Sequence, residues 1–219
     1  MSMAGSMPGS VSHDVILPPP PPTDGGWGDG GGNNHDNRGS GRRASFTGLY
    51  VLLAASTMVF AALTSALVVR RGLGDDWHSM PKPAILWVNT AILLASSVAL
   101  ELARRSLRKG ARSRFNGWWT LGTALGFAFL AGQVIAWKEL NDAGLYISSN
   151  PSNSFFYVFT YAHAFHLLGG VGALFYVDIQ ALRLSLGPAK RTAIDVSAIF
   201  WHFLDALWVY LMVLLYVWG

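Results

Sequence analysis

Five long apolar segments are the feature that most constrains this 219-residue chain. They cover approximately residues 46–69, 83–103, 118–137, 155–177 and 196–218. A helix rises about 1.5 Å per residue and the hydrocarbon core of a bilayer is about 30 Å thick, so about 20 apolar residues cross it. The sequence therefore predicts an all-α integral membrane protein with five transmembrane helices.

The composition supports this class and excludes several others. Hydrophobic residues make up 52% of the chain and charged residues only 13%, whereas about a quarter of a soluble domain is charged. The absence of cysteine excludes disulfides, Cys-ligated zinc, iron–sulfur clusters, a thiol nucleophile and the Cys ligands of a dinuclear copper centre. The net charge of +4 does not indicate nucleic acid, because the basic residues lie at the ends of apolar segments.

The distribution of basic residues predicts the orientation. Twelve lie on one side of the five segments: Arg38, Arg42, Arg43, Arg104, Arg105, Arg108, Lys109, Arg112, Arg114, Arg183, Lys190 and Arg191. Only Arg70, Arg71, Lys82 and Lys138 lie on the other side. Because Lys and Arg remain on the cytoplasmic side, we expect a cytoplasmic N-terminus and a C-terminus on the outside.

Residues 1–45 differ in composition from the 46–219 membrane domain. They contain five consecutive prolines at 18–22 and a stretch rich in Gly, Asn and Asp at 25–41. We expect a disordered cytoplasmic tail, with a polyproline ligand for a partner protein as the alternative. The first thirty residues lack the basic start and apolar centre of a signal peptide, so we expect the tail to be uncleaved.

Four ionisable residues fall inside the last two segments. His202 and Asp205 are one helical turn apart, so an imidazole can donate to the carboxylate, and their cost in lipid predicts that they face other helices. His163 and His166 are also one turn apart. They are either metal or heme ligands, or part of a hydrogen-bonded structural seam with His202 and Asp205. A metal site requires three or four protein ligands, which favours the seam.

Two further patterns have a structural interpretation. Gly122 and Gly126 are four residues apart, which predicts close approach of helix backbones. Glu101 precedes Arg104 and Arg105 by three and four residues, so its carboxylate is neutralised by its own helix.

Four motifs together resemble a known family. The second segment carries N-T-x-x-L-L-x-S-S, the third L-G-x-x-F-L-x-x-Q, the fourth T-x-x-H-x-x-H-x-x-x-G and the last W-H-F-x-D-x-x-W. They are filled by Asn89, Thr90, Leu93, Leu94, Ser96 and Ser97; by Leu125, Gly126, Phe129, Leu130 and Gln133; by Thr160, His163, His166 and Gly170; and by Trp201, His202, Phe203, Asp205 and Trp208. In this order they resemble subunit III of the heme-copper terminal oxidases, over residues 46–219, in the five-helix bacterial form.

The resemblance implies a function. It implies a non-catalytic subunit of a proton-pumping respiratory oxidase, the cytochrome c oxidase that reduces O2 to water, in a bacterial plasma membrane. Heme and copper are then expected in subunits I and II and no metal in this chain, with subunit I as the main partner. The subunit is expected to stabilise subunit I, to protect it against inactivation during turnover and to assist proton uptake.

The resemblance also implies an arrangement of helices and a role for lipid. The first two helices are expected to splay from a bundle of the last three, with phospholipid in the cleft between them. Basic side chains at helix ends are the expected headgroup ligands: Arg42, Arg43, Arg70, Arg71, Arg104, Arg105 and Arg183.

Other functions remain as alternatives. One is subunit III of a quinol oxidase or a relative associated with nitric-oxide reductase. Another is a self-contained membrane enzyme or transporter that uses His163, His166, His202 and Asp205 as its own site, although no interrupted repeat typical of transporters is visible.

The sequence departs from the family at two positions. Thr57 and Ala136 stand where many members carry a carboxylate. A hydroxyl and a methyl group cannot hold a titrating charge near neutral pH.

We therefore predict that carbodiimides do not modify the first membrane segment, because residues 46–69 contain no Asp or Glu. Peptide mass spectrometry of the labelled complex measures this. A stoichiometric adduct within residues 46–69 would contradict the alignment of Thr57.

Overall fold

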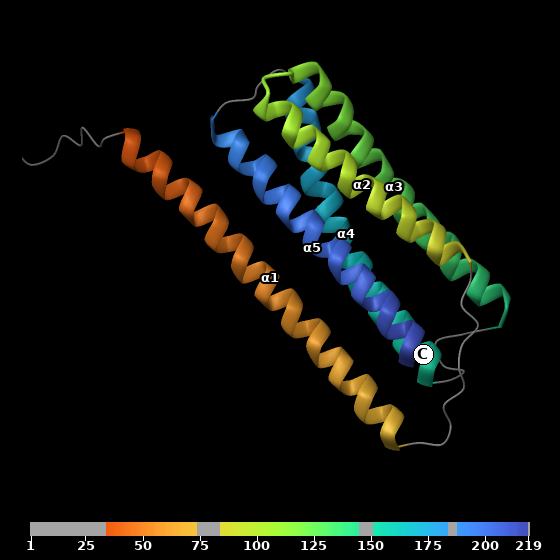
Figure 1. Cartoon of the computed structure of the whole chain (residues 1–219). Helices are drawn as coiled ribbons and strands as arrows, with labels where there is room; N and C mark the ends of the chain where they lie inside the picture. The colour runs from red at the N-terminus through yellow and green to blue at the C-terminus, as the bar shows by residue number, and fades with distance from the viewer. Residues whose placement is uncertain (1–33, 74–83, 145–150, 184–187, 219) are drawn as a thin grey trace, which may run out of the picture. The chain divides into compact units, whose positions relative to one another are not determined.

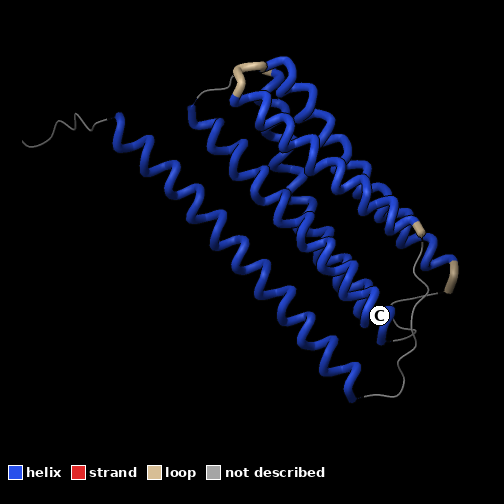
Figure 2. The backbone as a smooth tube through the Cα atoms, in the orientation of Figure 1, coloured by secondary structure: helices blue, strands red, loops and turns tan. Residues whose placement is uncertain are grey.

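A computed structural model describes residues 34–73, 84–144, 151–183 and 188–218. These residues form five α-helices (Figure 1): α1 Asn34–Leu73, α2 Ile85–Arg108, α3 Arg112–Asp142, α4 Pro151–Leu182 and α5 Pro188–Trp218. The described residues contain no strand (Figure 2). All five helices are long and apolar enough to cross a membrane. The predicted all-α fold with five spans is confirmed.

The first helix starts earlier than the sequence predicted. It begins at Asn34 and not near Phe46, so the prediction of a disordered tail is wrong for residues 34–45, while residues 1–33 lie outside the described part of the chain. Extending an existing helix costs far less than nucleating one. The hydroxyls of Ser45 and Thr47 also donate to the carbonyls of Gly41 and Arg43, each at 3.0 Å.

The predicted splay of the first two helices from the last three is wrong. The most extensive contact in the described residues joins α2 to α3, and α2 also packs on α5. α1 packs on α5 and, less, on α4, and does not contact α2. The first two helices therefore do not form a separate unit, and the expected cleft between them and the other three is not formed.

Side-chain size and polarity explain why α2 joins α3. The Ser96 hydroxyl donates to the carbonyl of Gly122 at 2.8 Å. Leu100 occupies the space next to Gly122. A Cβ atom added to Gly122 would lie 2.8 Å from Cγ of Leu100. About three turns further along α3, Asn89 of α2 packs against Gly132 in the same way. Without a hydrophobic drive between helices in lipid, such close contacts and hydrogen bonds determine which helices associate.

α1 packs through one narrow seam. Its buried side chains Leu49, Ser56, Phe60 and Leu67 follow the alternating spacing of a coiled coil. Near its C-terminal end, the hydroxyls of Thr64 and Tyr210 on α5 are 3.0 Å apart. The Arg71 guanidinium donates to the carbonyl of Val217 at 3.4 Å. Most of the other described side chains of α1 are exposed, and Phe46, Leu53 and Leu63 are partly buried beside the seam.

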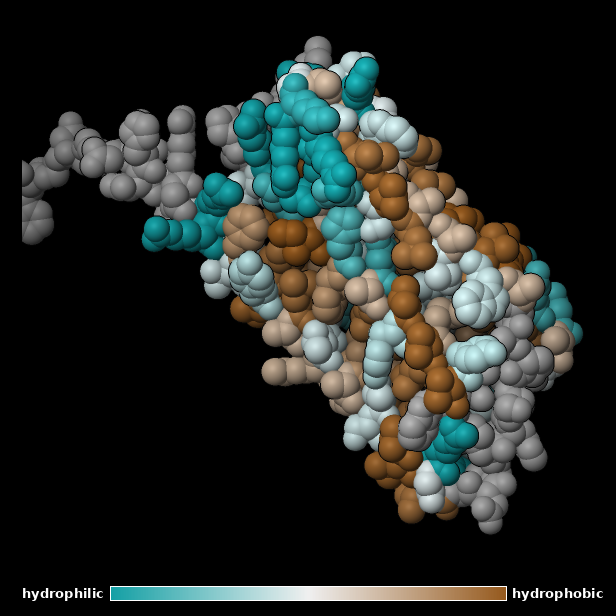
Figure 3. Space-filling model, in the orientation of Figure 1, coloured by the Kyte–Doolittle hydropathy of each residue, from teal (hydrophilic) through white to brown (hydrophobic). Residues whose placement is uncertain are grey.

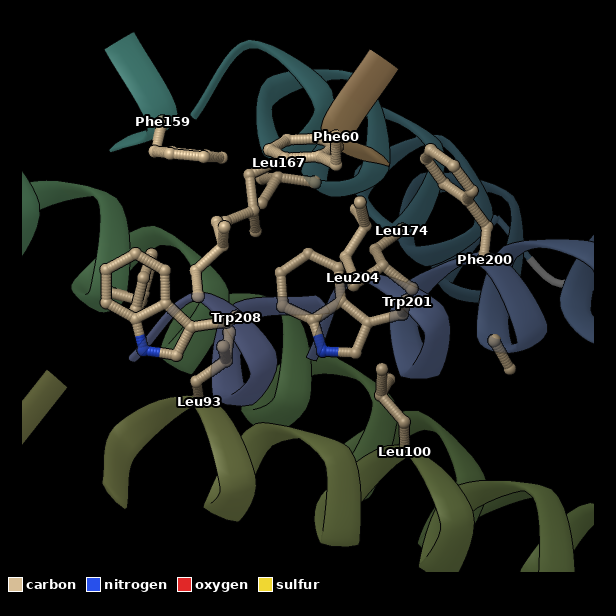
Figure 4. Close-up of a cluster of buried hydrophobic side chains, with 14 of the residues drawn as sticks. Phe60, Leu93, Leu100, Phe159, Leu167, Leu174, Phe200, Trp201, Leu204 and Trp208 are labelled. Carbon is tan, nitrogen blue, oxygen red and sulfur yellow. The ribbon is translucent and has the colours of Figure 1, made fainter. Parts of the chain in front are cut away.

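Two tryptophans of α5 form the centre of the buried core (Figure 4). Trp201 and Trp208 are almost completely buried, among Leu93 and Leu100 of α2 and Leu167 and Leu174 of α4. Glycines provide the space for Trp201: a Cβ atom on Gly126 of α3 would lie 2.8 Å from its Cη2, and one on Gly170 of α4 would lie 3.3 Å from its Cε3. The prediction that Gly122 and Gly126 allow close helix packing is confirmed.

The surface separates into an apolar belt and a hydrophilic end (Figure 3). On the face shown, the largest group of teal residues lies at the end of the molecule where α2 turns into α3 (Figure 1). That turn passes through Gly110, whose φ of 75° suits glycine. Arg104, Arg105, Arg108, Lys109 and Arg112 surround the turn. We refer to this end as the basic end.

We predict that Gly126→Ala destabilises the protein by about 1–3 kcal/mol, because the added methyl group collides with the rigid Trp201 ring. Gly169→Ala is the matched control, since nothing lies within 4 Å of its added Cβ and alanine favours a helix by up to about 1 kcal/mol. The thermal unfolding midpoint of the purified protein measures both. Equal midpoints for the two variants would contradict this account of the core.

Candidate functional site in the membrane interior

Three side-chain contacts join α2 to α5, and together we call them the polar ladder. On α2 they are spaced by seven residues, or about two turns, so they lie on one face. From the basic end inward, the contacts are Arg104 to Asp195 at 3.1 Å, Ser97 to His202 at 2.5 Å and Thr90 to Trp208 at 3.0 Å. Two antiparallel helices are thus joined by polar contacts along most of the length of α2.

The contact nearest the basic end is a small ion-pair network. Arg104 pairs with Glu101 of its own helix at 3.2 Å and with Asp195 of α5 at 3.1 Å. Arg105 pairs with the same Glu101 at 3.1 Å. The predicted neutralisation of Glu101 by both arginines is confirmed. Arg104 is the bridging residue, and its side chain is only 17% exposed compared with 65% for Arg105.

The middle contact contains the ionisable pair predicted on the last helix. Nδ1 of His202 is hydrogen-bonded to Ser97 of α2 and not to Asp205. Asp205 is 4% exposed, and neither carboxyl oxygen has a hydrogen-bond partner, although the Ser97 side chain lies beside the carboxyl group. The expected His202–Asp205 hydrogen bond is therefore not formed. The antiparallel packing of α2 on α5 supplies Ser97 as the nearer partner for the imidazole.

The two histidines of α4 have different surroundings from each other. His163 is buried, and neither ring nitrogen has a hydrogen-bond partner. Its ring packs against Phe60, Phe129 and Trp208, with centroids 6.4, 6.4 and 5.1 Å away. Nδ1 of His166 lies 2.7 Å from the carbonyl of Ala162, which can only accept.

The predicted seam of four residues is consequently divided in two. His163 and His166 share contacts with the Phe60 ring, whereas His202 and Asp205 lie beside Ser97. The physical reason is the rotation of α4, which turns its histidines toward aromatic rings. The expectation of one hydrogen-bonded seam is wrong.

A second set of polar contacts joins α3 to α4. The indole N–H of Trp119 donates to the carbonyl of Leu174 and that of Trp137 to the Thr160 hydroxyl, each at 3.1 Å. Thr120 donates to Asp178 at 2.7 Å.

Sequence reasoning missed Asp178, a buried carboxylate. The predicted fourth span ended at residue 177, but α4 continues to Leu182. The only signal in the sequence was the Thr120 hydroxyl, a possible partner for the Asp178 carboxylate. It could not be recognised as that partner without knowing that α3 packs on α4.

Thr57 and Ala136, the two positions where the resemblance led us to expect a carboxylate, lie apart from the polar contacts described above. Thr57 lies on the exposed surface of α1, where its hydroxyl donates to the carbonyl of Leu53 at 2.8 Å. Ala136 is fully buried in α3.

The candidate lipid-binding arginines differ in what they contact. Arg104 and Arg105 are already paired with carboxylates, and Arg71 reaches α5. Arg42 lies over the Phe46 ring with 5.8 Å to its centroid. The remaining candidates lie at helix ends: Arg43, Arg70 and Arg183.

These features define a class of protein. It is a polytopic helical membrane protein in which many buried polar side chains join helices, and no group of three or more His, Cys, Asp or Glu that could hold a metal ion occurs among the described residues. Residues 45–219 match the family of cytochrome c oxidase subunit III. The chain belongs to this family.

Similar curated proteins carry the same description. The cytochrome c oxidase subunit 3 of Corynebacterium diphtheriae is 32% identical over 77% of this chain and 85% of its own length. The cytochrome c oxidase subunit 3 of Thermostichus vulcanus is 29% identical over 78% of this chain and 85% of its own length. That of Gallus gallus is 33% identical over 73% of this chain and 62% of its own length. The predicted resemblance to subunit III of the heme-copper oxidases is confirmed.

We predict that Arg104→Gln lowers stability by about 1–3 kcal/mol, because it removes a charged bridge between helices and leaves Asp195 without its partner. Arg105→Gln is the matched control and should change stability by at most about 0.5 kcal/mol, since its exposed pair with Glu101 stays within one helix. Thermal unfolding in detergent compares the two. A larger loss for Arg105→Gln would contradict the bridging role of Arg104.

Proposed function

We propose that this chain is the non-catalytic subunit III of a proton-pumping respiratory terminal oxidase that reduces O2 to water. The observation that carries the proposal is the family match over residues 45–219. The contacts of the motif residues support it: Thr90, Ser96, Ser97, Thr160 and His202 make hydrogen bonds to other helices. Side chains that join helices suit a scaffold, and heme and copper then belong to subunits I and II.

Subunit I is the main proposed partner, with subunit II and the other members of the complex beyond it. The helices expose many large apolar side chains, such as Met58 on α1, Phe165 and Leu168 on α4 and Val213 on α5. Such surfaces suit either lipid or the helices of another subunit. We infer that one of these faces packs on subunit I and stabilises it during turnover.

The proposed orientation has the basic end of the bundle in the cytoplasm, in a bacterial plasma membrane. Lys and Arg are retained on the cytoplasmic side, and the α2–α3 turn carries most of the basic residues of α2 and α3. The C-terminus would then lie outside.

Phospholipid is the proposed ligand of basic residues at the helix ends. Arg42, Arg43 and Arg183 are exposed and suit lipid phosphates through charge-assisted hydrogen bonds. Arg104 and Arg105 are less suited because each already forms an ion pair with a carboxylate. Arg70 and Arg71 would serve the outer leaflet.

We predict that an affinity tag on this chain recovers a complex with the heme and copper of its partners, which oxidises reduced cytochrome c. The same tagged chain, produced without subunit I, should contain no stoichiometric heme or copper. Metal analysis and optical spectra measure both samples. Stoichiometric metal or turnover in the isolated chain would overturn the accessory role and favour a self-contained enzyme.

The electron donor is tested on the same preparation. Oxidation of quinol but not of cytochrome c by the recovered complex would support the quinol-oxidase alternative. A complex formed without this chain should keep its heme spectrum and lose activity faster during turnover.

A further inference from the structure

We propose that Asp205 exchanges a proton with water at the basic end of the molecule, and that Ser97 and His202 carry this proton along the polar ladder. The inference rests on the contacts between α2 and α5 and does not depend on the proposed oxidase role.

The starting point is the isolation of the Asp205 carboxyl group. It is 4% exposed and neither oxygen accepts a hydrogen bond of normal geometry. A charge in the membrane interior without a partner is costly, and binding a proton removes that cost. A group in this position needs a route by which the proton enters and leaves.

Ser97 and His202 provide the first part of that route. The Ser97 side chain lies beside the Asp205 carboxyl group and is also hydrogen-bonded to Nδ1 of His202. A hydroxyl both donates and accepts. An imidazole can accept a proton on one ring nitrogen and release one from the other. The two groups can therefore pass a proton without leaving their positions.

Glu101 lies near the aqueous end of the route. It follows Ser97 by one helical turn in the direction of the basic end, and it is close enough to His202 for their charges to interact. Its side chain is 32% exposed, so water reaches this end of the route. Arg104 and Arg105 hold its carboxylate in place.

The proton balance is simple. A proton from water at the basic end binds Nε2 of His202, which is half-buried, while the proton on Nδ1 moves to the Ser97 oxygen. The Ser97 hydroxyl proton moves to Asp205, which leaves His202 with its proton on Nε2 instead of Nδ1. The net change is one proton transferred from water to the Asp205 carboxylate, and release follows the same steps in reverse.

Away from the basic end, the polar ladder stops at the contact between Thr90 and Trp208. The next contact is the indole N–H of Trp208, which donates to Thr90 and cannot accept a proton. The Thr90 hydroxyl itself donates to the carbonyl of Leu86 at 2.8 Å. A proton on Asp205 therefore has no continuation through this contact and communicates with the basic end.

The charged groups that face the route belong to its own two helices. They are Glu101, Arg104 and Arg105 on α2 and Asp195 on α5. The described histidines of α4, His163 and His166, face Phe60 instead.

Infrared spectroscopy of the purified complex in D2O tests the proposal. The carbonyl band of protonated Asp205 is identified as the band that Asp205→Asn removes. We expect its intensity to fall as the pH is raised, because the band belongs to the protonated carboxyl group. On transfer to D2O, its isotope shift should be at least about tenfold slower in Ser97→Ala and in His202→Phe than in the wild type, because each removes a proton carrier.

Two further variants separate proton transfer from helix packing. Ser97→Thr keeps the hydroxyl and should restore the wild-type exchange rate. Thr90→Val removes a different α2–α5 hydrogen bond and should leave the rate unchanged even where it lowers stability. Equal exchange rates in the wild type, Ser97→Ala and His202→Phe would overturn the proposal, as would the absence of a titrating Asp205 band or equal slowing by Thr90→Val.

Discussion

The fold depends on how closely the backbones of α3 and α4 can approach the ring of Trp201. Lipid offers no hydrophobic drive for helices to associate, so shape and hydrogen bonds must supply the energy. Gly126 on one helix and Gly170 on the other leave the ring enough space, and a methyl group at Gly126 would collide with it. Leu100 fits beside Gly122 by the same principle. Three glycine contacts therefore bring α2, α3, α4 and α5 together around Trp201 and the neighbouring Leu100.

Polar side chains then determine that α2, and not α1, packs closely with α3, α4 and α5. α2 donates to the backbone of α3 through Ser96 and is joined to α5 by three contacts of the polar ladder. α1 has no comparable connection to α2 and packs on α5 and α4 along a single seam. A hydrogen bond is valuable here because lipid cannot replace it. This is why the second helix joins the later three and the first remains peripheral.

The family motifs acquire a physical meaning from these contacts. Ser96 and Ser97 are adjacent, so they point to different neighbours: one bonds α3 and the other bonds α5. The Thr160 hydroxyl accepts a hydrogen bond from the indole N–H of Trp137, and Gly170 leaves space for the Trp201 ring. These residue types join helices, whereas Asp205, His163 and Gln133 are buried among them without hydrogen-bond partners.

The sequence by itself determined the number of helices, their approximate limits and the neutralisation of Glu101, because hydropathy, length and spacing within one helix are local properties. It also identified His163 and Asp205 as buried polar residues and placed His202, which is half-buried, between helices. Only the tertiary structure decided that His202 bonds Ser97, that His163 lies among aromatic rings and that Asp178 has a partner. Those outcomes depend on the pairing and rotation of helices far apart in the chain, and a one-residue change in rotation turns a side chain by about 100°. Local spacing contains no information about that rotation.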